Sequence, residues 1–351
     1  MSPQALAERT RLIDTGEASL QVGDVDAARR AFEQAANMAH MGEIELGLLR
    51  THMQAGEYRQ ALAFAAHTAG VHLDHVEGAA FYAWLLNLGA QVAIADQSLQ
   101  AAEGREPTHA MLKAVRQRLQ SRAMLASGDL LQAPARLAPF ATGAVPAPAA
   151  QVAATGLLLA DGRHALVPRS ALQAGASIWL RNGLGQTVPA KLAHPSEPDE
   201  HLGLVMLLLS EPLPVPSGQA VPPRDAFAGS PAFALDFLQG AGAQPAWPVM
   251  RAGFVGAPMS LTSPWSRLGV SLPLPGSGLR GGPVYDAGGR LLGLAQASEA
   301  GDKLVPISAL RTRFGDRFGV ATPEPRPSPV GADEVYERAL KACLQVLVAR
   351  P

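Results

Sequence analysis

The stretch that decides the fold runs from Gly276 to Gly293 and reads GSGLRGGPVYDAGGRLLG. Its centre is a Gly-Gly-Pro sequence at residues 281–283, and Arg280 stands directly before the glycine pair. Apolar residues on both sides of the Asp-Ala-Gly-Gly sequence predict two short strands joined by a turn.

The whole region from residue 151 to residue 320 continues this pattern. Short apolar runs alternate with turns rich in Gly, Pro and Asp, which is typical of an all-β domain. The runs are TGLLLA, HALVP, ASIWLRN, LGLVMLLL, PAFALDFL and RLLGLAQA. We therefore predict a β domain over residues 151–320.

Five segments of this region resemble, in order, segments of trypsin-like serine proteases of the HtrA/Deg type. The family's nucleophile segment reads G-N/D-S-G-G-P, and Gly278 and the Gly-Gly-Pro sequence match it. The other four segments are TGLLLADGRHALVPRSAL, PDEHLGLVML, PAFALDFLQG and KLVPISALRTRF. The resemblance implies a chymotrypsin-type double β-barrel.

The resemblance also implies where the catalytic triad would lie. The family's histidine aligns with Ser170, its aspartate with His201 and its serine with Arg280. Asp199 lies two positions from His201, so a shifted register at the aspartate stays open. A guanidinium stays protonated and is no nucleophile, and a serine hydroxyl cannot replace an imidazole as the base. We therefore expect a pseudoprotease and not an enzyme.

Other interpretations of this region stay open. Ser277 could act with His201 as a displaced nucleophile in an atypical serine hydrolase. The inactive cleft could instead hold a small ligand in a regulatory subunit. Arg280 either fills the vacant cleft, pairing with Asp286 or Asp199, or offers its guanidinium to a carboxylate of a partner.

The first 141 residues repeat with a period near 34. Segments that start at Gly23, Gly56, Gly89 and Gly128 can be aligned, with spacings of 33, 33 and 39 residues. A small residue at the turn between helices and alanines at fixed offsets resemble the tetratricopeptide (TPR) repeat. The resemblance implies a solenoid of paired helices, with an irregular helical bundle as the alternative.

A TPR array presents a groove lined by the first helix of each pair, and such grooves bind helices or extended peptides. By register, we expect Glu17 and Gln21 to face this groove, together with the candidates for binding a protein partner, Arg50, Gln54, Asn87, Arg118 and Arg122. Arg280 is a further candidate, in the inactive cleft. The alternative for each helical residue is an ordinary solvated face.

Two Pro-rich linkers and one helix complete the expected organisation. The linkers cover residues 142–150 and 321–331. Residues 332–349, ADEVYERALKACLQVLVA, predict a short C-terminal helix with an apolar stripe that buries Cys343. The expected fold class is multidomain α + β, with a TPR-like solenoid over residues 1–141 and a trypsin-like double barrel over 151–320.

Composition narrows the function classes. The formal net charge is −1, which argues against nucleic acid as the main partner. The single cysteine, the absence of an apolar signal segment and the lack of a spanning run predict a soluble cytoplasmic protein without membrane contact. CxxC, HExxH and Walker A sequences do not occur, so we expect no cofactor and no metal site.

Abundant Ala, Gly and Pro favour a bacterial origin. Both halves resemble domains that bind polypeptides. We therefore predict an adaptor, scaffold or assembly factor that binds another protein.

Overall fold

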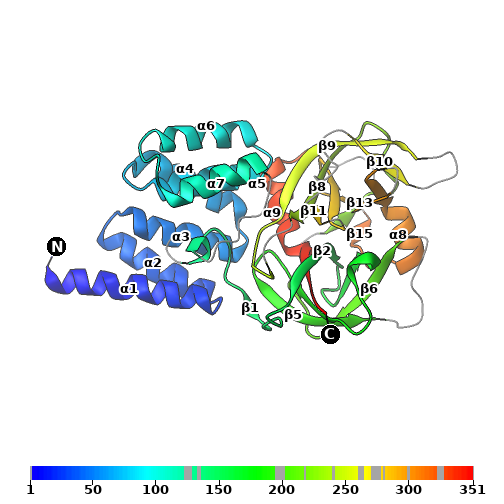
Figure 1. Ribbon diagram of the computed structural model, residues 1–351, viewed down its shortest axis with the longest axis horizontal. Helices are drawn as coiled ribbons and strands as arrows, with labels where there is room; N and C mark the ends of the chain where they lie inside the picture. The colour runs from blue at the N-terminus through cyan, green and yellow to red at the C-terminus, as the bar shows by residue number, and fades with distance from the viewer. Residues whose placement is uncertain are drawn as a thin grey trace. The chain divides into compact units, whose positions relative to one another are not determined.

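The computed structural model describes residues 2–121, 129–132, 136–193, 202–216, 219–238, 242–259, 265–269, 278–279, 281–298, 301–321 and 328–350. The chain forms two compact units, Met1–Thr142 and Gly143–Pro351 (Figure 1). Within the described ranges, no helix has the length and apolar character needed to cross a membrane.

The first unit is helical, and its helices pack on one another in chain order (Figure 1). They are α1 (Pro3–Gln21), α2 (Val25–Met38), α3 (Gly42–Ala55), α4 (Tyr58–Val71), α5 (Val76–Leu88), α6 (Val92–Glu103) and α7 (Ala110–Ser121). Three hairpins, α1–α2, α3–α4 and α5–α6, follow from the short turns.

Left-handed residues make these turns, which explains the 33-residue spacing. Gly23 and Gly56 have φ of +78° and +71°, a conformation that glycine adopts without strain. At the third turn Ala90, directly after Gly89, takes φ of 67°. Between the first two hairpins the fully buried ring of Phe32 fills the space beside α1 and α3.

The fourth predicted repeat does not form a helix pair among the residues that are described. After α7 the chain makes a 3-10 turn at Asp129–Leu131, and residues 136–141 are not helical. This segment packs back on α3. The Gln54 side chain donates to the Phe140 carbonyl (3.2 Å) and accepts from the Phe140 N–H (2.6 Å).

The second unit contains two closed six-stranded barrels with antiparallel neighbours throughout. Barrel 1 consists of β2 (Gln151–Leu158), β3 (His164–Pro168), β4 (Ser177–Arg181), β5 (Gln186–Leu192), β6 (Leu204–Leu209) and β16 (Cys343–Ala349). Barrel 2 consists of β8 (Pro231–Leu238), β9 (Val249–Pro258), β10 (Ser266–Leu268), β12 (Pro283–Asp286), β13 (Leu291–Gln296) and β14 (Lys303–Pro306).

Short elements complete this unit. Helices α8 (Ile307–Phe314) and α9 (Ala332–Ala342) follow β14, and β11 (Gly278–Leu279) pairs with β8. β7 (Ala220–Val221) and β15 (Val320–Ala321) form a parallel pair. The expected linker over residues 142–150 begins with β1 (Thr142–Gly143), and Ala144 N–H donates to the Thr187 carbonyl of β5.

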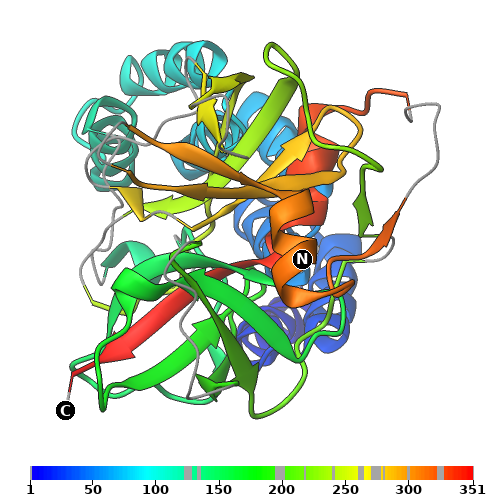
Figure 2. The ribbon, with the colours of Figure 1, turned by 90° about the vertical axis from the view of Figure 1, so that its right-hand side faces the viewer.

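The two barrels share one circular strand order. Around barrel 2 the order is β8-β9-β10-β14-β13-β12, so the strands follow as first, second, third, sixth, fifth and fourth. Around barrel 1 the order β16-β2-β3-β6-β5-β4 is the same if β16 is counted first. The last strand of the chain therefore fills the place of the first strand of barrel 1. Figure 2 shows β16 in red among the green strands.

The prediction of a helix over residues 332–349 is wrong from Cys343 onward. Helix α9 ends at Ala342, and all seven residues of β16 are buried between β2 and β4. The sequence CLQVLVA is an almost continuous apolar run, and such a run is typical of a strand covered on both faces. Periodicity alone does not separate this pattern from a buried helix segment. Cys343 is buried, as predicted.

A substitution in β16 tests its place in the barrel core. The Leu344 side chain is fully buried in the barrel 1 cluster. We expect Leu344→Ala to lower the free energy of unfolding by about 2–5 kcal/mol, because it leaves a cavity. Val320→Ala, on the exposed strand β15, should change it by less than about 0.5 kcal/mol. Denaturant unfolding of the full-length chain measures both, and equal effects would contradict this placement.

A second prediction concerns acid stability of the helical unit. Glu57 precedes α4 and accepts hydrogen bonds from Arg29 of α2 (2.9 Å) and from the His52 ring of α3 (2.6 Å). Burial raises the pKa of Glu57, but the bonds to Arg29 and His52 outweigh burial and lower it. Since the folded pKa is depressed, this stabilisation is present above about pH 4.5 and is lost as pH falls through the folded pKa.

Glu57→Gln should therefore destabilise the chain at pH 7 by no more than about 1 kcal/mol, because the carboxylate is partly exposed. The difference from wild type should shrink as the pH is lowered below 4.5. Urea unfolding across this range measures it. Glu33→Gln, on an exposed position of α2, is the control; a pH-independent difference for Glu57→Gln would refute the assignment.

Candidate functional site at the junction of the two barrels

The Gly-Gly-Pro loop lies where the two barrels meet. Gly281 has φ of +110°, and its N–H donates to the Ala295 carbonyl of β13 at 2.9 Å. A methyl group on Gly281 would lie 2.2 Å from the Thr155 carbonyl oxygen of β2 and 2.5 Å from Pro168 at the end of β3. Only glycine allows the loop to touch the backbone of barrel 1 in this way.

Asp236 holds the loop from the side of barrel 2. This carboxylate is fully buried on β8 and accepts hydrogen bonds from Gly282 N–H (2.9 Å) and from Arg251 (2.7 Å). The adjacent Phe237 N–H donates to the Thr155 hydroxyl of barrel 1 at 2.9 Å. A buried carboxylate is tolerated only with such partners. Asp236 therefore joins the loop, β8 and, through Phe237, barrel 1.

The thiol of Cys343 lies near this carboxylate but offers no chemistry. Its Sγ atom is 3.9 Å from the Leu235 carbonyl oxygen. Burial raises the pKa of Cys343, and the charge of Asp236 raises it further. The thiol stays protonated and inaccessible, so it is no nucleophile.

Chain neighbours of the three aligned triad positions meet at this junction. Ser170 is exposed on the 3-10 turn that follows β3, two residues beyond Pro168, which contacts Gly281. Arg169 N–H donates to the Gly203 carbonyl at 3.0 Å. The Gln296 side chain of barrel 2 donates to the same carbonyl at 3.1 Å.

Four residues predicted at or near this site lie outside the described residues, namely Asp199, His201, Ser277 and Arg280. The residues that flank them are described, namely Leu202 and Gly203 in barrel 1, and Gly278 and Leu279 beside β8 of barrel 2. The sequence alignment and the fold thus bring the three segments together, and Ser170 is the position whose side chain is described.

Among the described residues of barrel 1, His164 forms an imidazole–carboxylate pair with Asp161, at the start of β3 and not at the end beside Ser170. Its Nδ1 lies 2.7 Å from Asp161 Oδ2, and Arg317 approaches the ring at 3.1 Å. Burial raises the pKa of Asp161, but bonds from Arg163 N–H and His164 outweigh it and lower the pKa, so the carboxylate is ionised. The length of β3 separates His164 from Ser170. Among the described residues, no imidazole is hydrogen-bonded to Ser170.

The two closed six-stranded barrels, with the circular strand order that they share, fit the trypsin-like double-barrel fold.

No protein-family model matches the chain, and no curated protein matches its sequence. The chain is similar to a solved structure of the MamO protease domain from Magnetospirillum magneticum in its apo form. The identity is 17%, over 48% of this chain and 97% of that chain, with a TM-score of 0.35. It is also similar to Deg5, with 18% identity over 50% of this chain and 91% of that chain, and a TM-score of 0.35. The assignment of the double barrel rests on the strand order and not on these likenesses.

A hollow of about 350 Å³ on barrel 2 lies away from this junction. It opens at the turn after β12, whereas the Gly-Gly-Pro loop precedes β12. Asp286 lines it and pairs with the buried Arg290 at 2.7 Å. The pairing of Arg280 with Asp286 or Asp199 stays a prediction, because Arg280 and Asp199 lie outside the described residues. Prolines and small residues form much of the remaining wall, so the hollow adds no catalytic pair.

The residues predicted to line a groove in the helical unit differ in their exposure and in their partners. Arg50, 3% exposed on α3, pairs with Glu17 of α1. Gln54 is buried against Phe140. The prediction that Arg50 and Gln54 face a partner is therefore wrong, because both are used inside the unit. Asn87 is half-buried on α5 and Arg118 is buried on α7, while Arg122 lies outside the described residues.

A second buried arginine fixes the segment that covers Gln54. Arg136 donates to the Pro139 carbonyl (2.6 Å) and to the Leu131 carbonyl, and its guanidinium lies 4.0 Å from the centre of the Phe140 ring. Burial lowers the pKa of Arg136 to about 10, with a contribution from Arg50, so the side chain is charged at neutral pH. The alanines of this segment follow the spacing of the repeat, and the sequence therefore predicted a helix here. Pro139 is the residue that indicates otherwise, because proline disfavours a helix interior.

Alanine substitutions at two glycines distinguish the cost of a left-handed backbone from the cost of a steric clash with barrel 1. Gly281→Ala combines φ of +110° with a clash against Thr155, whereas Gly301→Ala meets a similar φ of +101° with no atom within 4 Å. We expect Gly281→Ala to be less stable than Gly301→Ala by at least about 2 kcal/mol, since overpacking adds to the strain. Denaturant unfolding measures both variants. Equal losses would show that the loop does not press on barrel 1.

Proposed function

We propose that this protein is a non-catalytic protein-binding adaptor or assembly factor, in which a TPR-like helical unit is joined to a trypsin-like pseudoprotease. One observation carries the proposal. Chain segments that would bear a triad converge at the Gly-Gly-Pro loop, and the residues that the sequence places there are Ser170, His201 and Arg280.

These residues do not supply acyl transfer. The reaction needs a hydroxyl or thiol nucleophile, a base that takes its proton and a carboxylate that orients the base. Arg280 stays protonated, and Ser170 at the position of the base accepts no proton from a nucleophile at neutral pH. In a well-studied triad, the loss of the nucleophile or of the base lowers turnover by about 10⁶-fold.

The persistence of the Gly-Gly-Pro loop without a nucleophile has a physical reason. Gly281 touches the backbone of barrel 1, and a Cβ on Gly282 would lie 1.8 Å from the Leu235 carbonyl oxygen. Gly281 is therefore required where the loop meets barrel 1, and Gly282 where the loop meets β8 of barrel 2. This supports a domain that keeps its architecture for a purpose other than hydrolysis.

The helical unit supports the choice of a polypeptide partner. Three hairpins with left-handed turns at 33-residue spacing support the TPR interpretation. Within the chain, α3 already binds an extended segment, since Gln54 pairs with both backbone groups of Phe140. Extended peptides are recognised through their main-chain groups in the same manner.

The absence of hydrolysis is tested first. The purified full-length chain is treated with a fluorophosphonate probe and with a fluorogenic casein substrate. We expect no labelling and no turnover above the Ser170→Ala variant. Labelling that disappears in Ser277→Ala would replace the adaptor by the atypical hydrolase.

The binding role is tested by matched variants of two exposed serines on barrel 1. Ser170→Arg changes the junction, and Ser177→Arg changes β4 away from it. Affinity purification from the native cells with mass spectrometry should recover one stoichiometric partner with wild type and Ser177→Arg, and at least tenfold less with Ser170→Arg if the junction binds it. Retention by both variants would move the interface to the helical unit, and no partner with any form would refute the adaptor.

A further inference from the structure

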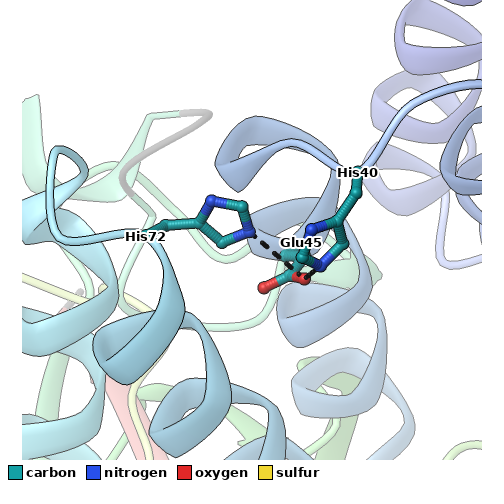
Figure 3. Close-up of side chains that lie close together, drawn as sticks. All are labelled: His40, Glu45 and His72. Atoms are coloured by element: carbon teal, nitrogen blue, oxygen red, sulfur yellow. Dashed lines mark ion pairs between the residues drawn. The ribbon is translucent and has the colours of Figure 1, made fainter.

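The helical unit gathers histidines around one buried carboxylate, far in sequence from the barrel junction. Glu45 is 7% exposed in the first turn of α3. The Nε2 atoms of His40, His67 and His72 lie 2.6, 3.2 and 3.4 Å from the same oxygen, Glu45 Oε1. Figure 3 shows His40 and His72 directed at this carboxylate from opposite sides.

Hairpin geometry explains this convergence. The turn between α3 and α4 is short, so the first turn of α3 lies beside the end of α4. His67 belongs to α4, His72 directly follows it, and His40 stands in the loop before α3. The N-terminal end of α3 favours the negative charge of Glu45, and the C-terminal end of α4 favours positive charge.

The carboxylate of Glu45 is oriented by a hydrogen bond from α4. Thr68 Oγ1 donates to Glu45 Oε2 at 2.7 Å. One oxygen is thus fixed by Thr68, and the other faces the imidazoles.

A second observation points to a ligand. The Nε2 atom of His72 is buried, and its contact with Glu45 Oε1 at 3.4 Å does not have the geometry of a hydrogen bond. A buried nitrogen held this loosely has capacity to bind a ligand. The ring of His40 lies 4.7 Å from that of His72 between centroids, so the space beside this nitrogen is framed by a second imidazole.

The distances fit a tetrahedral transition-metal ion. Zinc takes nitrogen and oxygen ligands at about 2.0–2.2 Å, so its ligand atoms lie roughly 3.3–3.6 Å apart. Glu45 Oε1 already has nearly this separation from His67 and His72. His40, in an exposed loop, needs to move outward by less than about 1 Å. The ligand atoms of His40, Glu45 and His72 all lie within 4.8 Å of one another.

We propose that His40, Glu45 and His72 bind one Zn²⁺ ion, with His67 rotating in as the fourth ligand. Neutral imidazoles with one carboxylate are a ligand set that zinc favours, and four protein ligands make a closed, structural site. The ion would clip the loop before α3 to the end of α4, and so fasten the second hairpin to the first. This inference does not depend on the proposed protein-binding function.

Calorimetric titration of the chelator-treated full-length chain with ZnCl₂ tests the proposal. We expect one Zn²⁺ per chain and a higher thermal unfolding midpoint with zinc, because the ion binds the folded form. Glu45→Gln and His72→Ala should weaken binding by more than about 100-fold, since even outer partners of a metal site contribute roughly 10–100-fold. Co²⁺ should give the visible absorption of a tetrahedral site in wild type and not in His72→Ala.

His109→Ala is the matched control. It removes an imidazole that pairs with the single carboxylate of Glu77 at 3.4 Å, and zinc affinity should not change. His40→Ala, at a 60% exposed loop position, should keep the fold and lose zinc binding. The proposal can therefore be tested even if the variants at buried positions misfold. Failure of wild type to bind zinc, or binding that persists in His40→Ala, would overturn the proposal.

Discussion

The two antiparallel ladders of β16 are the interaction on which the C-terminal unit depends. β16 pairs with β2 on one side and β4 on the other, and without it both would be edge strands with unpaired backbone groups. Val348 lies opposite Gln151, so the end of β16 meets the start of β2 as in a hairpin. Since β16 is the last element of the chain, barrel 1 closes only through contacts of very long sequence separation, which are slow to form.

The Gly-Gly-Pro loop at the junction is held by close contacts with backbone carbonyls and by one buried carboxylate. The positions of Gly281 and Gly282 are set by carbonyl groups of both barrels, and the buried Asp236 ties the loop to β8. A side chain on Gly281 would collide with the Thr155 carbonyl of barrel 1, and a side chain on Gly282 would collide with the Leu235 carbonyl of β8. Packing against these carbonyls accounts for both glycines of the loop without reference to catalysis.

Polar groups in the helical unit are used internally, and this changes the interpretation of its faces. Arg50 and Gln54 lie on the helix face that the repeat predicted as a groove, but their partners are Glu17 and the backbone of Phe140. Glu57 joins three successive helices through Arg29 and His52. The cluster of His40, Glu45 and His72 differs from these pairs, because its ligand atoms all lie within 4.8 Å of one another.

The sequence by itself determined the local patterns. Alternating short apolar runs indicated the β domain, glycines 33 residues apart marked the helix turns, and the apolar setting of Cys343 predicted its burial. Only the tertiary structure decided that residues 343–349 form a strand, that Phe140 covers Gln54, and that His40 and His72 meet at Glu45. The physical reason is the same in each case. Periodicity reports that a face is buried, whereas the identity of its partner depends on contacts between residues far apart in the chain.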